Sequence, residues 1–134
     1  MRAWWLALAL VAVAAANLDG RPHQQELCTT IGQSALPMTV TGDDVCLRLT
    51  SNVVWHANSP APAITWQGKR GELQFSGNRL QLTHPCGRGL YIPDGGEVTV
   101  FDAVISTPEQ TQCPDSHGIL GDYGGALTMY GGEV

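Results

Sequence analysis

Carboxylates are the side chains of this sequence best suited to chemistry, because they bind cations and act as general acids and bases. Asp43 and Asp44 are the only adjacent pair. They follow a glycine and precede an apolar run, which favours a turn over an active site. Asp94 and Asp122 each precede a Gly-Gly pair and could share a calcium ion if the fold stacked these turns. Turn formation alone accounts for both residues more simply.

Nucleophilic and zinc chemistry are not indicated. The sequence has no Gly-x-Ser-x-Gly motif, and spacing connects none of its four histidines to a serine or cysteine. A zinc site would require closely spaced cysteines or histidines, and the sequence has none. We therefore predict no catalytic residue and no metal ligand, and the chain is more simply a binding or structural protein than an enzyme.

Aromatic residues are better candidates for a binding surface. Phe101 and Tyr130 close two similar runs of alternating residues, and both fall on the outward phase of their predicted strands. Exposed rings in a row can stack on the faces of sugar rings. Packing of both rings against the N-terminal segment is the alternative, and it is slightly favoured. Together with Asp94 and Asp122, these two aromatic residues are the predicted binding residues.

The N-terminus resembles a secretory signal peptide. Arg2 is followed by an apolar run over residues 3–16 that ends in three alanines, so we expect cleavage after Ala16, with Ala14 as the alternative. The run is shorter than the roughly 20 residues that a membrane-spanning helix needs. The sequence therefore predicts a secreted protein with a signal peptide over 1–16 and no membrane segment in its mature form.

The composition of the sequence predicts one small all-β domain after this signal peptide. Seven basic residues stand against 12 acidic ones and are scattered, which excludes a nucleic-acid-binding surface. Sixteen glycines and a charged fraction of only 14% favour turn-rich β-structure. We expect an N-terminal arm over 17–37 and the domain over 38–134. The clearest predicted strands are 38–40, 45–49, 64–66, 72–75, 80–82, 97–101 and 126–130.

An internal repeat indicates how these strands are arranged. Residues 88–105 align without a gap on residues 117–134, and four positions, three glycines and a threonine, are identical. An earlier copy, residues 71–80, matches residues 96–105. Three apolar columns result: Leu73 with Val98 and Leu127, Phe75 with Val100 and Met129, and Leu80 with Ile105 and Val134. Such recurrence predicts a coil whose units bury their apolar faces against each other.

The repeats DGGEVTVFDAVI and YGGALTMYGGEV resemble the rungs of right-handed parallel β-helix proteins with the pectin-lyase-like fold. They also resemble the GGA-type repeats of polymorphic outer-membrane proteins and related adhesins. The resemblance covers residues 71–134 and implies about three rungs after an irregular N-terminal β region. A small disulfide-bonded β-sandwich is the alternative fold, because Gly-rich hairpins have a similar composition.

The catalytic patterns of pectin-lyase-like enzymes are present only in fragments. A polygalacturonase-like site would need four short elements, and this sequence has only Asp43-Asp44 and an imperfect Ser116-His117-Gly118. The sequence therefore favours a secreted module for extracellular binding, adhesion or surface structure, with carbohydrate as ligand. A polysaccharide lyase or glycoside hydrolase, or a fragment of one, is the second hypothesis. A small extracellular β-sandwich binding module is the third.

The four cysteines are expected to form disulfides, because exported proteins fold in an oxidising environment. Three pairings are possible. Shifting Cys113 back by the repeat places it two residues from Cys86, so these two should bond on adjacent rungs, which leaves Cys28 to bond Cys46.

The C-terminal residues stop inside the repeat pattern, which leaves an apolar rung without a cap. The pattern favours a chain that is one piece of a longer repeat protein. The alternative is self-association through this uncapped C-terminal rung.

Overall fold

The structure is a computed structural model that describes residues 24–56, 61–84, 87–107, 117–122 and 124–133. These residues form twelve short strands and one 3-10 helix. The helix, η1, covers Gln33–Ala35. The strands are β1 (Thr29–Ile31), β2 (Met38–Val40), β3 (Cys46–Leu49), β4 (Val53–Trp55), β5 (Pro62–Trp66), β6 (Gly71–Gln74), β7 (Leu80–Leu82), β8 (Arg88–Ile92), β9 (Glu97–Phe101), β10 (Ile105–Ser106), β11 (His117–Gly121) and β12 (Ala126–Tyr130).

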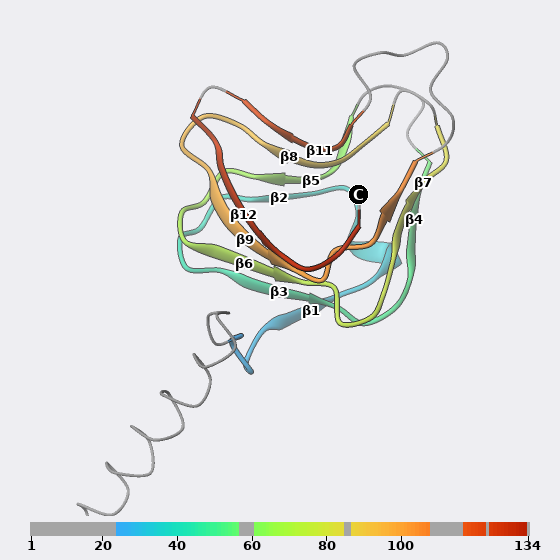
Figure 1. Cartoon of the computed structure of the whole chain (residues 1–134), viewed down its shortest axis with the longest axis horizontal. Coiled ribbons are helices and arrows are strands. Elements are labelled where there is room, and N and C mark those ends of the chain that lie inside the picture. Colours follow the sequence, from blue (N-terminus) through green and yellow to red (C-terminus); the bar gives the residue numbers. More distant parts are fainter. Residues whose placement is uncertain (1–23, 57–60, 85–86, 108–116, 123, 134) are drawn as a thin grey trace, which may run out of the picture.

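All strand pairs among the described residues are parallel, and they build three sheets. Sheet A has the order β1-β3-β6-β9-β12, sheet B the order β11-β8-β5-β2, and sheet C the order β10-β7-β4. From β2 onward the chain passes from sheet B to sheet A to sheet C and then begins the same circuit again. Figure 1 looks along the resulting stack, with the three sheets around a common interior. The predicted all-β class is confirmed, and the parallel pairing differs from the antiparallel sheets of a sandwich.

The interior of the stack is filled by apolar columns that run from one circuit to the next. In sheet A, Leu47, Leu73, Val100 and Met129 are successive register partners. The first three are at most 4% exposed. Equivalent columns join Met38, Ile64, Leu90 and Ile119 in sheet B and Val53, Leu80 and Ile105 in sheet C. Each strand therefore contributes alternate residues to one shared core.

The register confirms the repeat between the last two circuits and corrects the earlier one. Leu127 pairs with Val98 and Met129 with Val100, as the ungapped alignment predicts. The predicted partner of Leu73 was Val98, but Leu73 pairs with Val100, so this alignment was wrong by two residues along the strand.

The predicted pairing holds again in sheet C, where Leu80 pairs with Ile105. The turn between β6 and β7 is two residues longer than the turn between β9 and β10 and absorbs the difference. Val134, the third member of that predicted column, lies outside the described residues.

Sheet A contains more strands than the three or so predicted rungs imply. β3 joins β6 with Leu47 beside Leu73, and β1 joins β3 with Ile31 beside Leu49. Neither strand carries the Gly-Gly pair that marks the later copies. β1 lies within the segment 17–37 that the sequence assigns to an arm, so part of this segment belongs to the sheet.

Two strand glycines have a packing reason to be glycine. A Cβ on Gly71, at an inward position of β6, would lie 2.2 Å from the ring of Trp66, which is completely buried. A Cβ on Gly89 in β8 would lie 2.5 Å from the carbonyl oxygen of Gly118 in β11. Such strand glycines mark places where a bulky ring or another backbone passes close by.

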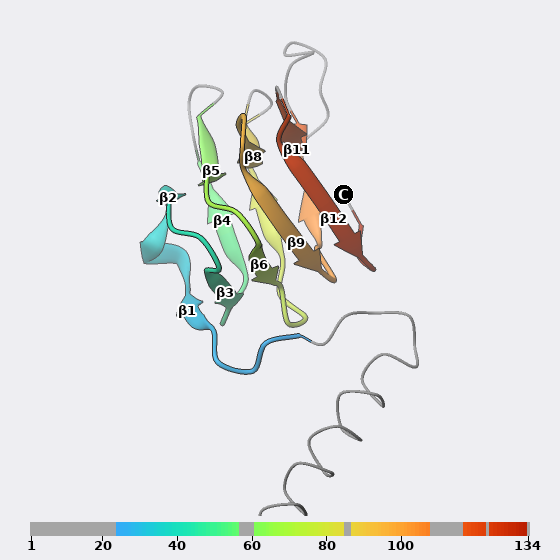
Figure 2. The ribbon, with the colours of Figure 1, turned by 90° about the vertical axis from the view of Figure 1, so that its left-hand side faces the viewer.

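The N-terminal end of the stack is covered by the chain itself, as the view in Figure 2 shows. Ile31 is buried, and Ala35 and Leu36 pack against the core around η1. The side-chain amide of Gln33 accepts the N–H of Val54 at 2.6 Å and donates to the Val54 carbonyl. It thereby takes the place of a neighbouring strand at the free edge of β4.

A disulfide fastens this N-terminal cover. Cys28, directly before β1, bonds Cys46, the first residue of β3, as predicted. The predicted bond between Cys86 and Cys113 and the predicted signal peptide over 1–16 lie outside the described residues. In the part of the chain that the structure describes, no helix has the length and apolar character to cross a membrane.

Candidate functional site

The outer face of sheet A carries the most organised set of polar and aromatic side chains. Because residues alternate across a strand, the register of β6, β9 and β12 arranges the outward residues in columns. One column joins Glu72, Thr99 and Thr128, and a second joins Gln74, Phe101 and Tyr130. Glu97 and Ala126 lie beside each other at the start of their strands, next to Arg70.

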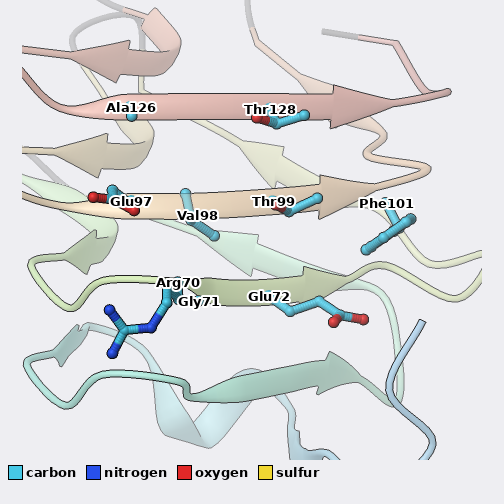
Figure 3. A pocket seen from close by; sticks show the side chains of 9 residues that line it. All are labelled: Arg70, Gly71, Glu72, Glu97, Val98, Thr99, Phe101, Ala126 and Thr128. Atoms are coloured by element: carbon cyan, nitrogen blue, oxygen red, sulfur yellow. The ribbon is translucent and has the colours of Figure 1, made fainter. Parts of the chain in front are cut away.

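These columns border a hollow of about 340 Å³. Figure 3 shows it from close by, with Thr99 and Thr128 on neighbouring strands, Glu97 and Arg70 toward the strand beginnings and Phe101 at the strand ends. Its lining is Arg70, Gly71, Glu72, Glu97, Val98, Thr99, Phe101, Ala126 and Thr128. The hollow therefore offers hydroxyl and carboxylate groups along a row of parallel strands, with an aromatic residue at one end.

The single cation in the lining is held by two aspartates. Arg70 donates from Nε and Nη2 to the two carboxylate oxygens of Asp44, at 2.8 and 3.1 Å, and its Nη2 lies 3.9 Å from Asp43. The hydrogen bonds from Arg70 lower the pKa of Asp44 and raise the pKa of Arg70. Asp43 also accepts the N–H of Lys69 at 2.8 Å. Asp43 and Asp44 thus brace a turn, the interpretation that the sequence favoured.

Glu72 connects the hollow to the N-terminal segment. It is only 7% exposed, and its Oε1 accepts the N–H of Gln25 at 3.0 Å and the Nε2 of Gln74 at 2.6 Å. Gln74 also donates to the Gln25 carbonyl at 2.8 Å, while Arg48 donates to Gln74 at 2.8 Å. The segment before β1 is therefore bound across the first strands of sheet A, and the open part of the face lies over β9 and β12.

The two aromatic residues that the sequence singled out come together on the outer face of sheet A. The rings of Phe101 and Tyr130 stack with their centroids 5.5 Å apart and their planes 16° apart. Tyr130 is partly exposed, whereas Phe101 is only 2% exposed, so Phe101 is not an open platform. Alternation along a strand determines to which face a side chain points, whereas the segments packed around that side chain determine how much of it is exposed.

Asp94 and Asp122, which the sequence suggested could share a calcium ion, lie in the turns that follow β8 and β11. Asp94 is exposed, whereas Asp122 is partly buried and accepts a hydrogen bond from the Tyr91 hydroxyl at 3.2 Å. Among the described residues, no group of three or more His, Cys, Asp or Glu side chains is placed to hold a metal ion.

The sequence interpretation did not single out the hydroxyl column. Thr99 and Thr128 are the one identical non-glycine pair in the aligned repeats, so the signal was present. Glu72, Glu97 and Arg70 carry no such signal, because residues of other types stand at the equivalent positions of the neighbouring strands. Only the register of the three strands shows that these residues surround one hollow.

No family model, curated protein or solved structure matches the chain. The function therefore has to be inferred from the outer face of sheet A itself. Its features are a hollow lined by hydroxyls and carboxylates, an arginine already paired with aspartates, and a stacked aromatic pair.

Proposed function

We propose that this chain is a secreted, short right-handed parallel β-helix that binds a neutral polysaccharide along the outer face of sheet A. The observation that carries the proposal is the column of Thr99 and Thr128 in a hollow that Phe101 closes at one end. This site lies on the face formed by β6, β9 and β12. It includes Phe101, one of the predicted binding residues, but neither Asp94 nor Asp122.

The arrangement of the strands supports the β-helix. Three parallel sheets are visited in a fixed order, and the core columns continue from circuit to circuit. Connections between parallel strands are right-handed in nearly all proteins, which supports a right-handed coil. The Cys28–Cys46 disulfide agrees with export to an oxidising compartment.

The chemistry of the hollow supports an extended, hydroxyl-rich ligand. Neighbouring strands lie about 4.8 Å apart, so Thr99 and Thr128 present hydroxyls at a regular spacing along the stack. A threonine hydroxyl both donates and accepts hydrogen bonds, and the Glu97 carboxylate accepts them, which suits the hydroxyl groups of sugars. The partly exposed ring of Tyr130 adds an apolar surface for a sugar face.

The charges favour a neutral polymer over a uronate polymer. The hollow contains Glu72 and Glu97, and its single arginine is paired with Asp44. The whole chain has a formal net charge of −5. An acidic polysaccharide would therefore meet repulsion without a free cation to offset it. The same lack of a free cation argues against a lyase activity, because a lyase must neutralise the uronate carboxylate before it removes the neighbouring proton.

Affinity electrophoresis in gels containing xyloglucan, galactomannan or polygalacturonate would test this function. We expect the two neutral polymers to retard the chain and polygalacturonate to leave its mobility unchanged. Replacing both Thr99 and Thr128 by alanine should weaken binding about tenfold, as the loss of two hydrogen bonds predicts. The matched control replaces Thr39 and Thr65, which are neighbours on the outer face of sheet B.

Three results would contradict the proposal. The first is unchanged mobility in both neutral gels. The second is equal weakening by the Thr99/Thr128 and Thr39/Thr65 variants. The third is ultraviolet-absorbing unsaturated product from polygalacturonate, which would indicate a lyase.

A further inference from the structure

We infer that two copies of this chain pair through the C-terminal ends of their stacks, with β12 of one copy beside β12 of the other. This interface runs along the backbone edge of β12, whose residues Ala126 and Thr128 border the hollow, but it does not depend on carbohydrate binding. Three features of β12 carry the inference: its free backbone edge, its exposed apolar side chains and its lack of charge.

The backbone of β12 has an edge that faces away from β9. Ala126 donates to the Gly96 carbonyl at 2.8 Å, and the Tyr130 carbonyl accepts the N–H of Asp102 at 2.8 Å. In a parallel ladder, successive residues direct their N–H and C=O groups to opposite sides. Leu127 and Met129 therefore point their backbone groups to the outer edge, where sheet A ends within the described residues.

The same two residues expose the apolar interior of the stack. Leu127 is 38% exposed and Met129 is 37% exposed, although both continue columns whose earlier members are buried. Val98 and Val100, their partners on β9, are 3% and 0% exposed. Another strand laid against β12 would satisfy the free backbone groups and cover these side chains in one step.

Nothing in the sequence of this edge protects it against another strand. Protein edges are commonly guarded by lysine, proline or a bulge. Residues 124–132 contain neither a charged residue nor a proline. A neutral edge is compatible with a second copy of itself, since two-fold pairing brings the same neutral segment of both chains together. It offers no electrostatic preference for a partner of opposite charge.

The other end of the stack determines how the two copies meet. Head-to-tail stacking is obstructed at the N-terminal end, where Ala35 and Leu36 around η1 pack against the core and the amide of Gln33 occupies the edge of β4. We therefore place the C-terminal end of one copy against the C-terminal end of another. A two-fold axis between the two β12 strands makes them antiparallel, and the assembly stops at two chains.

Sedimentation of the purified chain over a wide concentration range would test the pairing. We expect a reversible dimer that forms no larger species. Met129→Lys should give a monomer with an unchanged circular-dichroism spectrum, because it buries a charge at the interface. Gln81→Lys, at an exposed position of sheet C, adds the same charge elsewhere and should leave the dimer intact.

Amide hydrogen exchange on the unaltered chain decides the question even if Met129→Lys does not fold. The amides of Leu127 and Met129 should become protected as concentration rises, whereas the exposed amides of the turns should not change. A chain that stays monomeric, a series of growing assemblies, or a dimer in which these two amides exchange quickly would each overturn the inference.

Discussion

The two ends of the stack differ: the N-terminal end is covered, whereas the C-terminal end exposes apolar side chains. At the N-terminal end, a short strand, a 3-10 helix and a glutamine side chain cover the core and the free edge of sheet C, and a disulfide fastens the segment. At the C-terminal end, β12 exposes Leu127 and Met129 and carries no charged residue.

This difference shows which part of a stacked fold a repeating sequence can encode. Inside the stack, each strand meets copies of itself on both sides, so the same apolar pattern serves every circuit. An end meets no such copy, and its free backbone groups need partners of another kind. Here Gln33, which lies outside any repeat, supplies them for β4, whereas no described strand pairs with the outer edge of β12.

The largest expected effect comes from comparing one core column at its centre and at its open end. Leu73→Ala should lower the free energy of unfolding by about 3 kcal/mol, because it leaves a cavity at a fully buried position. Met129→Ala, at the exposed end of the same column, should cost less than about 1 kcal/mol in the monomer. Urea unfolding at low protein concentration measures both values.

Equal losses for the two variants would contradict the comparison, since they would mean that the last circuit is as well packed as the middle one. Leu127→Ala is the matched control. It has nearly the same exposure as Met129 and should give a similarly small loss.

A smaller effect is expected from the fastening of the N-terminal cover. Replacing Cys28 and Cys46 by serine removes a cross-link that closes a short loop, and such links contribute about 2 kcal/mol. We expect the amides of β1 to lose protection in hydrogen exchange while those of β9 keep it. Loss of protection throughout all three sheets would show instead that the N-terminal cover is required for the whole fold.

The sequence predicted strands and repeats well where its pattern was strictly periodic. The ungapped match between residues 88–105 and 117–134 gave the register of β9 and β12 correctly. The earlier match failed by two residues, because a slip of two keeps every side chain on the same face and leaves the apolar pattern intact. Only the length of the turn after β6 distinguishes the two registers, and turn length leaves no apolar signal.

The candidate site was less predictable than the fold. Alternation placed Phe101 and Tyr130 on the outer face and beside each other, which the stacked rings confirm. It could not show that Phe101 is buried, since burial depends on segments distant in sequence. The partners of Arg70 and Glu72 lie up to 47 residues away along the chain. Contacts over such distances along the chain cannot be predicted from the spacing of residues within one repeat.

The smallest expected effect concerns the edge that Gln33 covers. Its side-chain amide makes two hydrogen bonds with the backbone of Val54, so Gln33→Ala leaves one donor and one acceptor of β4 without their partner. Water can partly replace these two hydrogen bonds, because Gln33 is exposed. We therefore expect the free energy of unfolding, measured in urea, to fall by about 1 kcal/mol. Gln33→Glu keeps the acceptor for the Val54 N–H but places a carboxylate beside the Val54 carbonyl, so it should recover little of that loss.

Gln81→Ala is the matched control: Gln81 is the register partner of Val54 on β7 and is also exposed. If Gln33→Ala proves no more destabilising than Gln81→Ala, the amide of Gln33 does not cap this edge, and the N-terminal end of sheet C is as open as the outer edge of β12.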